Sequence, residues 1–428
     1  MQHNHNLEQE LPPQWQAWCI WGAATTFTIY QLAIQIGYGS LESGIDKSLS
    51  LNLVQSAVVS GSFLFVYSLM QLPAGLLLDR FSPRLLLASS ATLCGLMAYG
   101  FAVANSFTTA LLFRSALGGL AAFGFPAAGL LARRWIHPAR FGFAMGLIDF
   151  FFGLGAIGGD SGFSELLTHG FLWQDVMILL TFFGIGIGML CGLVVRDRPG
   201  NMQKTRSRID LWTALGVLLR TREVLLSLMF YAGMAGVLFG FGGLWDIRLQ
   251  MAFGFDEKDA VNLNSWIFVG LAISAPVSGL LADHMKNRQR LLLIGATGSL
   301  IAVLGLLFIP LVWPYAMIAL HLCLTGMMLG TSVVIFGVAC DAVPKRYSAT
   351  TIGLINAAGC FLGAVLQVLP ALLLGSSKDH PLPVYQQVLS VNLLALTASV
   401  IAALLLQKTM RNTLSPSVSD GERKKTSC

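Results

Sequence analysis

Charged side chains are scarce in this chain of 428 residues: they make up 11% of it, whereas hydrophobic residues make up 55%. A soluble domain contains about 25% charged residues. So much apolar surface cannot be hidden inside a soluble fold, so we expect lipid to cover part of it. The 45 glycines are typical of helices that approach one another closely in a bilayer. The composition therefore indicates an all-α integral membrane protein.

The sequence also lacks the patterns of enzymes and metalloproteins. Its seven cysteines and seven histidines are scattered and have neither disulfide nor metal-ligand spacing. It contains no Gly-x-x-x-x-Gly-Lys-Ser/Thr loop for a nucleotide, so direct ATP drive is not expected. We expect no enzymatic activity, no cofactor and no metal. The segment 1–14 has no Lys or Arg, so we expect no cleaved signal peptide and a first apolar run that stays in the membrane.

About twelve apolar runs reach the roughly 20 residues that a spanning helix needs. A polar gap, 196–221, separates six of them from the other six. We predict two six-helix bundles, 1–195 and 224–407, joined by a cytoplasmic linker, 196–223, and followed by a cytoplasmic tail, 408–428. Part of the linker, 210–220, could form an amphipathic helix on the membrane surface. The predicted spans are 17–38, 53–78, 84–104, 108–131, 141–163, 172–195, 224–247, 261–282, 290–311, 314–337, 350–375 and 384–407.

The distribution of Lys and Arg predicts the orientation of these helices. If the N-terminus is cytoplasmic, 22 of the 27 basic residues lie in cytoplasmic turns or the tail, 4 lie on the opposite side, and Arg114 lies within a helix. Basic residues concentrate on the cytoplasmic side of membrane proteins, so both termini are expected inside. The net charge of +6 is then explained by topology, and we expect no nucleic acid partner.

Two stretches of the chain are nearly identical in pattern. Gly75, Asp79 and Arg84 recur as Gly279, Asp283 and Arg288, each 204 positions later. In each copy a glycine, three apolar residues and an aspartate are followed, five positions on, by an arginine. A charged turn that recurs halfway along an apolar chain indicates two related halves, which is typical of transporters.

These motifs resemble the major facilitator superfamily. The turn formed by Gly75, Asp79, Arg80 and Arg84 is similar to that family's signature loop, and Arg114 with the glycines after it resembles its helix 4 motif. The resemblance implies twelve helices in two pseudo-symmetric six-helix bundles, a central cavity and alternating access. Weaker likenesses, in 243–245 and 274–279, resemble bacterial metabolite importers of this superfamily.

The charged turns suggest a cytoplasmic latch. An aspartate at a helix end can accept backbone N–H groups near a positive dipole end, and an arginine can bridge it to a neighbouring helix. Such a latch would form when the bundles close on the cytoplasmic side, although plain helix capping explains the same residues. The latch candidates are Gly75, Asp79, Arg80, Arg84, Gly279, Asp283 and Arg288.

Ionisable groups within the predicted spans are functional candidates, because charge is costly at membrane depth. Arg114 could bind an anionic substrate or could be a structural partner of Asp160 or Asp149. Asp149 is the candidate proton carrier, since burial disfavours the charged form of a carboxyl group, with a structural helix contact as the alternative. Asp246 and Arg248 fall at the outer end of helix 7, as interface or gate residues.

The resemblance implies that helices 1, 4, 7 and 10 line the cavity. Each polar side chain on these helices could equally be a packing hydrogen bond. The substrate-cavity candidates on these helices are Tyr30, Gln31, Gln35, Arg114, Tyr231, Trp245 and His321, and Asn356 of helix 11 is a further candidate.

We therefore interpret the chain as a multi-pass secondary active transporter of the bacterial inner membrane. It would carry a small polar or anionic metabolite, such as an amino acid, nucleoside or organic acid, as a monomer, with proton symport as a hypothesis. The alternatives are efflux of a drug or metabolite by proton antiport, and a membrane receptor that binds its ligand without moving it.

Overall fold

The computed structural model describes residues 14–137, 140–197, 211–285, 287–308, 313–344, 347–377 and 380–414. All regular structure in these ranges is helical. The first half of the chain forms α1 (Gln14–Ile36), α2 (Tyr38–Leu49), α3 (Leu53–Arg80), α4 (Pro83–Ala102), α5 (Phe107–Ala121), α6 (Gly124–Trp135), α7 (Phe141–Ile157), η2 (Gly158–Gly162), α8 (Phe163–Thr168) and α9 (Trp173–Val194). The second half forms α11 (Arg222–Gly240), η3 (Phe241–Trp245), α12 (Asp246–Ala252), α13 (Glu257–His284), α14 (Arg288–Phe308), α15 (Tyr315–Gly330), η4 (Thr331–Val333), α16 (Val334–Asp341), α17 (Ser348–Leu374), α18 (Leu382–Leu389) and α19 (Val391–Leu414).

Eleven helical segments among the described residues are long and apolar enough to cross a membrane. The remaining predicted span, 17–38, corresponds to α1, which has 23 residues and is not among these eleven. Its polar side chains, including Thr28, Gln31 and Gln35, are buried inside the protein, so lipid does not select against them. The fold is the all-α membrane architecture that the sequence predicts.

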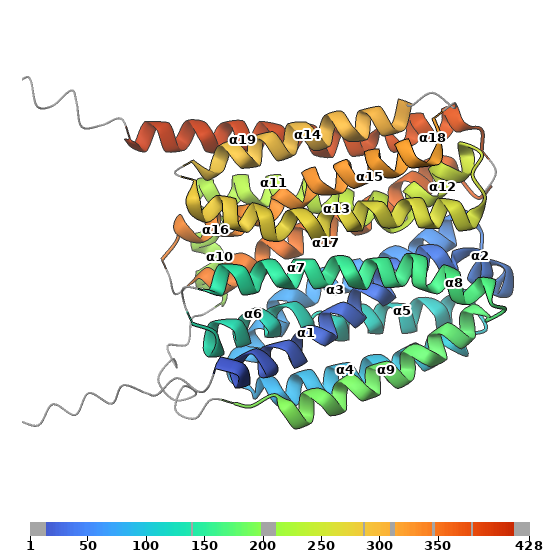
Figure 1. Ribbon diagram of the computed structural model, residues 1–428, viewed down its shortest axis with the longest axis horizontal. Coiled ribbons are helices and arrows are strands. Elements are labelled where there is room, and N and C mark those ends of the chain that lie inside the picture. Colours follow the sequence, from blue (N-terminus) through green and yellow to red (C-terminus); the bar gives the residue numbers. More distant parts are fainter. Residues whose placement is uncertain are drawn as a thin grey trace, which may run out of the picture.

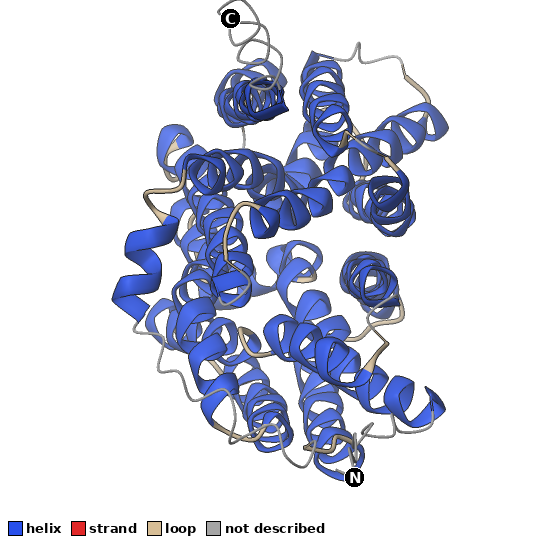
Figure 2. Cartoon of the chain, turned by 90° about the vertical axis from the view of Figure 1, so that its left-hand side faces the viewer, coloured by secondary structure: helices blue, strands red, loops and turns tan. Residues whose placement is uncertain are grey.

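The helices lie side by side in two groups (Figure 1), which are seen end-on in Figure 2. Within the first group α4 packs closely on α9, and a Cβ atom on Gly95 would lie only 2.7 Å from the carbonyl oxygen of Thr181. The two groups meet along α3 with α17 and along α7 with α13. There a Cβ atom on Gly153 would lie 2.6 Å from Cβ of Ala272, so this glycine lets helices of the two bundles touch.

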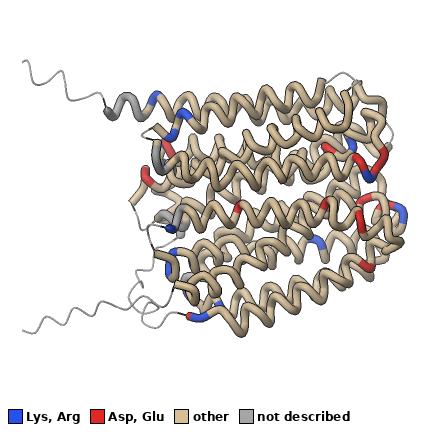
Figure 3. The backbone as a smooth tube through the Cα atoms, in the orientation of Figure 1, with Lys and Arg blue, Asp and Glu red and all other residues tan. Residues whose placement is uncertain are grey.

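Charged residues gather at the ends of the helices and leave the middle nearly free of them (Figure 3). The described ends of the chain, Gln14 of α1 and Leu414 of α19, lie at the same end of the bundle as the two charged turns (Figure 1). We call this the inner end, and the opposite one the outer end. Helix α19 continues past position 408, into the segment predicted as a tail.

Residues 198–210 of the predicted linker lie outside the described residues. The remainder includes α10 (Leu211–Leu218), a short helix within the segment 210–220 for which we predicted one. Its Ala214 and Leu218 pack against Val343 and Tyr347 of the second half. This contact holds the linker helix beside the inner end of the C-terminal bundle.

Several spanning helices are interrupted, which the sequence did not predict. A turn at Gly37 separates α1 from α2, and π-helical segments interrupt the fifth and seventh spans at η2 and η3. Such π-bulges widen a helix by one residue and often occur at functional sites. Here they carry or directly precede Asp160 and Asp246, two buried carboxyl groups at the outer end.

Candidate substrate cavity and outer gate

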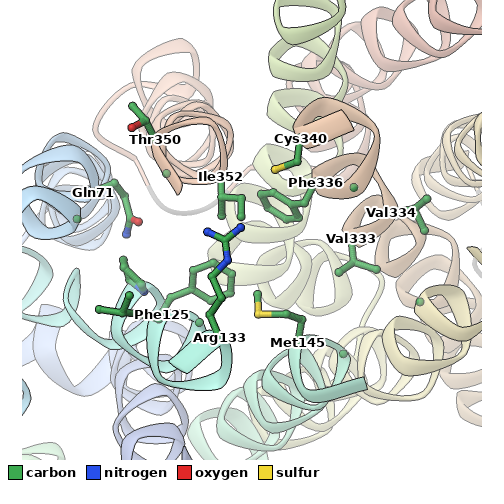
Figure 4. Close-up of a pocket in the computed structure, with 18 of the residues that line it drawn as sticks. Gln71, Phe125, Arg133, Met145, Val333, Val334, Phe336, Cys340, Thr350 and Ile352 are labelled. Carbon is green, nitrogen blue, oxygen red and sulfur yellow. The ribbon is translucent and has the colours of Figure 1, made fainter. Parts of the chain in front are cut away.

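A cavity of about 370 Å³ lies between the two bundles in the inner half of the protein. It is bounded by α3, α6 and α7 on one side and by α13, α16 and α17 on the other. Most of its lining is apolar and includes the large side chains of Phe125, Met145 and Phe336 (Figure 4). The lining contains two arginines and no carboxylate among the described residues. A cavity of this kind attracts anions, because low-dielectric walls focus the field of the charges that remain.

Arg133 is the basic residue that extends into this cavity (Figure 4). It lies in the last turn of α6, on a stripe with Pro126, Gly129 and Leu130 that also lines the cavity. Positions three and four apart share one helix face, so the stripe follows the helical period. The other lining arginine, Arg288, is already paired with Asp341 at 3.1 Å, whereas Arg133 forms no ion pair with a described residue.

The outward limit of the cavity is polar. Gln71 lines it, is 1% exposed, and both atoms of its amide group lack a hydrogen-bond partner. Behind it the hydroxyl of Tyr67 lies close to the amide groups of Gln31, Gln71 and Asn356. Buried amides without partners are costly, so they are available to bind a polar group of a ligand.

The outer end is closed by a buried ion pair between the bundles. Arg248 of α12 lies 2.8 Å from Glu42 of α2 and 3.9 Å from Asp46. The hydroxyl of Ser56 also donates to Glu42, at 2.8 Å. These side chains are nearly inaccessible, so the pair is only weakly screened by solvent. We call this contact the outer gate pair.

Four further side-chain contacts join the bundles near the outer end. They are Asn264 to Asp160 at 2.6 Å, Ser60 to Gln367 at 3.0 Å, Ser161 to Ser265 at 2.7 Å, and Lys258 to Glu165 at 3.1 Å. The described residues of the inner half surround a cavity instead. The protein is therefore closed at its outer end and hollow towards its inner end.

The two charged turns lie beside the hollow half, and none of their described hydrogen bonds or ion pairs joins the bundles. Arg84 donates to the carbonyl of Gly192 in its own bundle, at 2.6 Å, and Arg288 bonds within the other bundle. Gly75 and Gly279 line the cavity, and no atom would touch a Cβ at either position. Arg80 is exposed, and the side chains of Asp79 and Asp283 lie outside the described part of the structure. The latch remains a prediction for a conformation closed at the inner end.

Arg114 is buried in the first bundle rather than in the cavity. Its guanidinium group donates to the carbonyls of Ile34 and Gln35, both at 2.9 Å, and lies 4.9 Å from the ring centres of Tyr38 and Phe63. It satisfies carbonyls beside the turn between α1 and α2. No described hydrogen bond or ion pair joins it to either aspartate that we considered as its partner.

The two membrane aspartates occupy different places. Asp149 of α7 is half-buried and within electrostatic range of Tyr231 of the second bundle. Asp160 of η2 is completely buried at the outer end, where Asn264 contacts it.

None of the eight predicted cavity residues lines the cavity in this conformation. Three of them adjoin its polar limit: Gln31, and Tyr231 and Asn356, which are hydrogen-bonded to each other at 3.4 Å. Four of the other five form hydrogen bonds to backbone carbonyl oxygens: Tyr30 with Leu180, Trp245 with Gln367, His321 with Ala302, and Arg114 with α1. The fifth, Gln35, has no hydrogen-bond partner at Nε2.

Sequence reasoning missed Gln71 and Glu42, and it counted Arg133 only as a basic residue at a helix end. The spacing of Pro126, Gly129 and Arg133, which places them on one helix face, could have identified Arg133. No sequence signal marked Glu42, because its partner Arg248 is 206 positions away.

Comparison with known proteins identifies the family of this fold. The model of the Major Facilitator Superfamily matches residues 18–367. The chain belongs to the major facilitator superfamily. It is accordingly a multi-pass membrane transporter of a small molecule and not an enzyme.

Two of the relatives are named as probable transporters of anions. The chain is 26% identical over 376 residues to the probable nitrate/nitrite transporter NarK2 of Mycobacterium tuberculosis (strain ATCC 25618 / H37Rv), covering 85% of this chain and 89% of that protein. It is 23% identical to the probable sulfoacetate transporter SauU of Cupriavidus necator, covering 79% and 83% of the two proteins.

A solved structure with the same fold is a bacterial homologue of the human lysosomal transporter Spinster in an inward-facing, unoccupied conformation. The two structures align with a TM-score of 0.69 and 16% sequence identity, over 93% of this chain and 98% of the other.

Proposed function

We propose that this transporter carries a small organic anion across the bacterial inner membrane by alternating access. The observation that carries the proposal is the cavity itself: Arg133, an exposed side chain without a described counter-ion, extends into a largely apolar cavity whose lining contains no described carboxylate. Guanidinium pairs with carboxylate, sulfonate or phosphate through two parallel hydrogen bonds. The relatives, named for nitrate/nitrite and for sulfoacetate, support an anionic substrate.

The polar limit of the cavity favours a substrate with two functional groups. Arg133 would hold the anionic end, and the amide of Gln71 would bind a second polar group, with Phe125 and Phe336 packed on the body between them. A short carboxylate, sulfonate or phosphate ester with a second polar group has this form.

The orientation, coupling and assembly state complete the proposal. With the charged turns in the cytoplasm, both termini are cytoplasmic and the present conformation is inward-facing. The protein acts as a monomer without a nucleic acid partner, and its two bundles rock about the cavity. When the inner end closes, a latch forms between Asp79 and Arg84 of one turn and Asp283 and Arg288 of the other. Asp149 carries a proton during uptake.

Ligand binding tests the substrate class directly. Purified protein would be screened by thermal shift against nitrate, sulfoacetate, short dicarboxylates, phosphate esters, nucleosides and cationic drugs. A ligand at 100 times its dissociation constant stabilises the folded state by about 2.7 kcal/mol.

A binding anion should then be titrated against Arg133→Gln and against Arg290→Gln, an exposed arginine of α14 outside the cavity. Hydrogen bonds to a charged group contribute about 1.5–3 kcal/mol, so Arg133→Gln should weaken binding about 10- to 150-fold. Arg290→Gln should leave it unchanged. Equal binding by both variants, or binding of cationic drugs alone, would contradict the proposal and favour the efflux alternative. Binding without exchange of labelled ligand in liposomes would indicate a receptor.

A further inference from the structure

A second polar cluster lies at the outer end, away from the cavity. Asn264 of α13 donates from Nδ2 to Asp160 at 2.6 Å and to the carbonyl of Gly242 at 2.8 Å. Nearby in the second bundle, Gln250 donates to Asp246 at 2.9 Å. All four side chains are completely buried. The cluster joins the bundles, because Asp160 belongs to the first and Asn264 to the second.

This cluster has too few hydrogen-bond donors. Four oxygens have no partner: Oδ1 of Asp160, Oδ2 of Asp246, Oδ1 of Asn264 and Oε1 of Gln250. The free Oδ1 of Asn264 is bonded to the same carbon as the nitrogen that contacts Asp160, so it lies within the cluster. Every unpartnered atom is an acceptor. A ligand that satisfies such a cluster must supply positive charge or a hydrogen.

No described cation supplies that charge. Neither Asp160 nor Asp246 forms an ion pair with a described residue, and the group that acts electrostatically on Asp160 is Asp246, which has the same sign. Of the cations nearby, Arg248 is paired with Glu42, and Lys258 is paired with Glu165 at the surface. The other charged or titratable groups on the elements packed around η2, among side chains that the structure describes, are Cys19 and Tyr30 of α1, Tyr38, Glu42, Asp46 and Lys47 of α2, Asp149 of α7, Glu165 of α8, and Glu257, Lys258 and Asp259 of α13.

A buried carboxylate without a counter-ion is far more costly than a buried neutral carboxylic acid. We propose that Asp160, beside Asn264, takes up a proton from the outer aqueous phase as the outer gate closes, and so makes the gate a proton-controlled lock. The proton binds a carboxylate oxygen and returns to the outer phase when the gate opens and water again solvates the charge. No other bond is made or broken.

The sign of the pH effect follows from the number of protons bound. The closed gate holds Asp160 neutral, and the open gate exposes it as a carboxylate, so the closed state binds more protons. Acidification of the outer side therefore favours the closed gate and the inward-facing conformation. One linked proton changes the ratio of closed to open protein by up to tenfold per pH unit. This device differs from proton carriage by Asp149 and does not rest on the identity of the substrate.

Distances between spin labels at the outer end test the lock without any substrate. The labels would be attached at Phe171→Cys and Glu257→Cys, two exposed positions on opposite bundles, after replacement of the seven native cysteines by alanine. We call this labelled protein the outer reporter. Between pH 8 and pH 5.5 its closed population should rise, by up to tenfold per pH unit in closed-to-open ratio.

Two variants separate the lock from other titrations. In Asp160→Asn the neutral amide mimics the protonated acid, so the gate should stay closed at all pH values and lose its pH response. In Glu165→Gln the pH response should persist, because this exposed carboxylate is paired with Lys258 and stays charged. A full pH response in Asp160→Asn, or none in the unmodified reporter, would overturn the proposal. So would closure by sodium at a fixed pH of 8, which would assign the cluster to a metal cation instead.

Discussion

Replacing Arg248 with alanine should open the outer gate. In the closed gate this arginine lies 2.8 Å from Glu42, with side chains that are only 12% and 9% exposed. The substitution leaves Glu42 and Asp46 as buried carboxylates without their cation. In the outward-open conformation water would solvate both carboxylates, so the substitution raises the free energy of the closed state more than that of the open state.

The size of this effect can be worked from the geometry. Breaking a buried ion pair by removing one partner costs about 3–5 kcal/mol, and the remaining exposure places this pair near the lower figure. Since 1.36 kcal/mol corresponds to a tenfold change, a loss of about 3 kcal/mol lowers the ratio of closed to open gate about 150-fold. A closed state that outnumbers the open state by less than about 150-fold would then become the minor conformation.

The outer reporter measures this ratio directly. Arg248→Ala should shift the distance distribution to longer values and slow transport, because the cycle can no longer close at the outer end. Lys258→Ala is the matched control: it removes the cation of another pair between the bundles, but that pair is exposed and should matter little. If both variants leave the distances unchanged, the buried pair does not hold the gate and the reasoning fails.

Three further predictions address other parts of the molecule. Arg114→Gln should lower the free energy of unfolding by about 2 kcal/mol, measured by thermal or denaturant unfolding, because two carbonyls lose a charged donor; a weaker affinity for the transported anion at unchanged stability would instead assign this arginine to the substrate. Asp149→Asn should abolish accumulation driven by an imposed pH gradient and preserve exchange of labelled substrate, whereas undiminished accumulation would remove it from coupling. Gly153→Val should clash with Ala272 and lengthen the outer reporter distances, and unchanged distances would mean that α7 and α13 can separate without opening the gate.

The sequence by itself determined the class and much of the fold. A spanning helix needs a fixed length of apolar residues, so the predicted spans coincide with the observed ones to within a few residues in most cases. The recurrence of Gly75, Asp79 and Arg84 at an offset of 204 indicated two related halves and led to the family. These features depend on local composition and on spacing along the chain, which the sequence contains in full.

Only the tertiary structure decided which side of each helix faces lipid, the protein interior or the cavity. In a soluble helix the polar face marks solvent, but here lipid and protein interior are both apolar, so the pattern of hydrophobic residues does not reveal the rotation of a helix. Arg114 and Arg133, on neighbouring helical segments, illustrate this: one is enclosed by α1 and aromatic rings, and the other extends into the cavity. Contacts such as Glu42 with Arg248 and Asp160 with Asn264 join distant segments through the packing of two bundles. No spacing in the sequence encodes them, because each joins segments that are far apart along the chain.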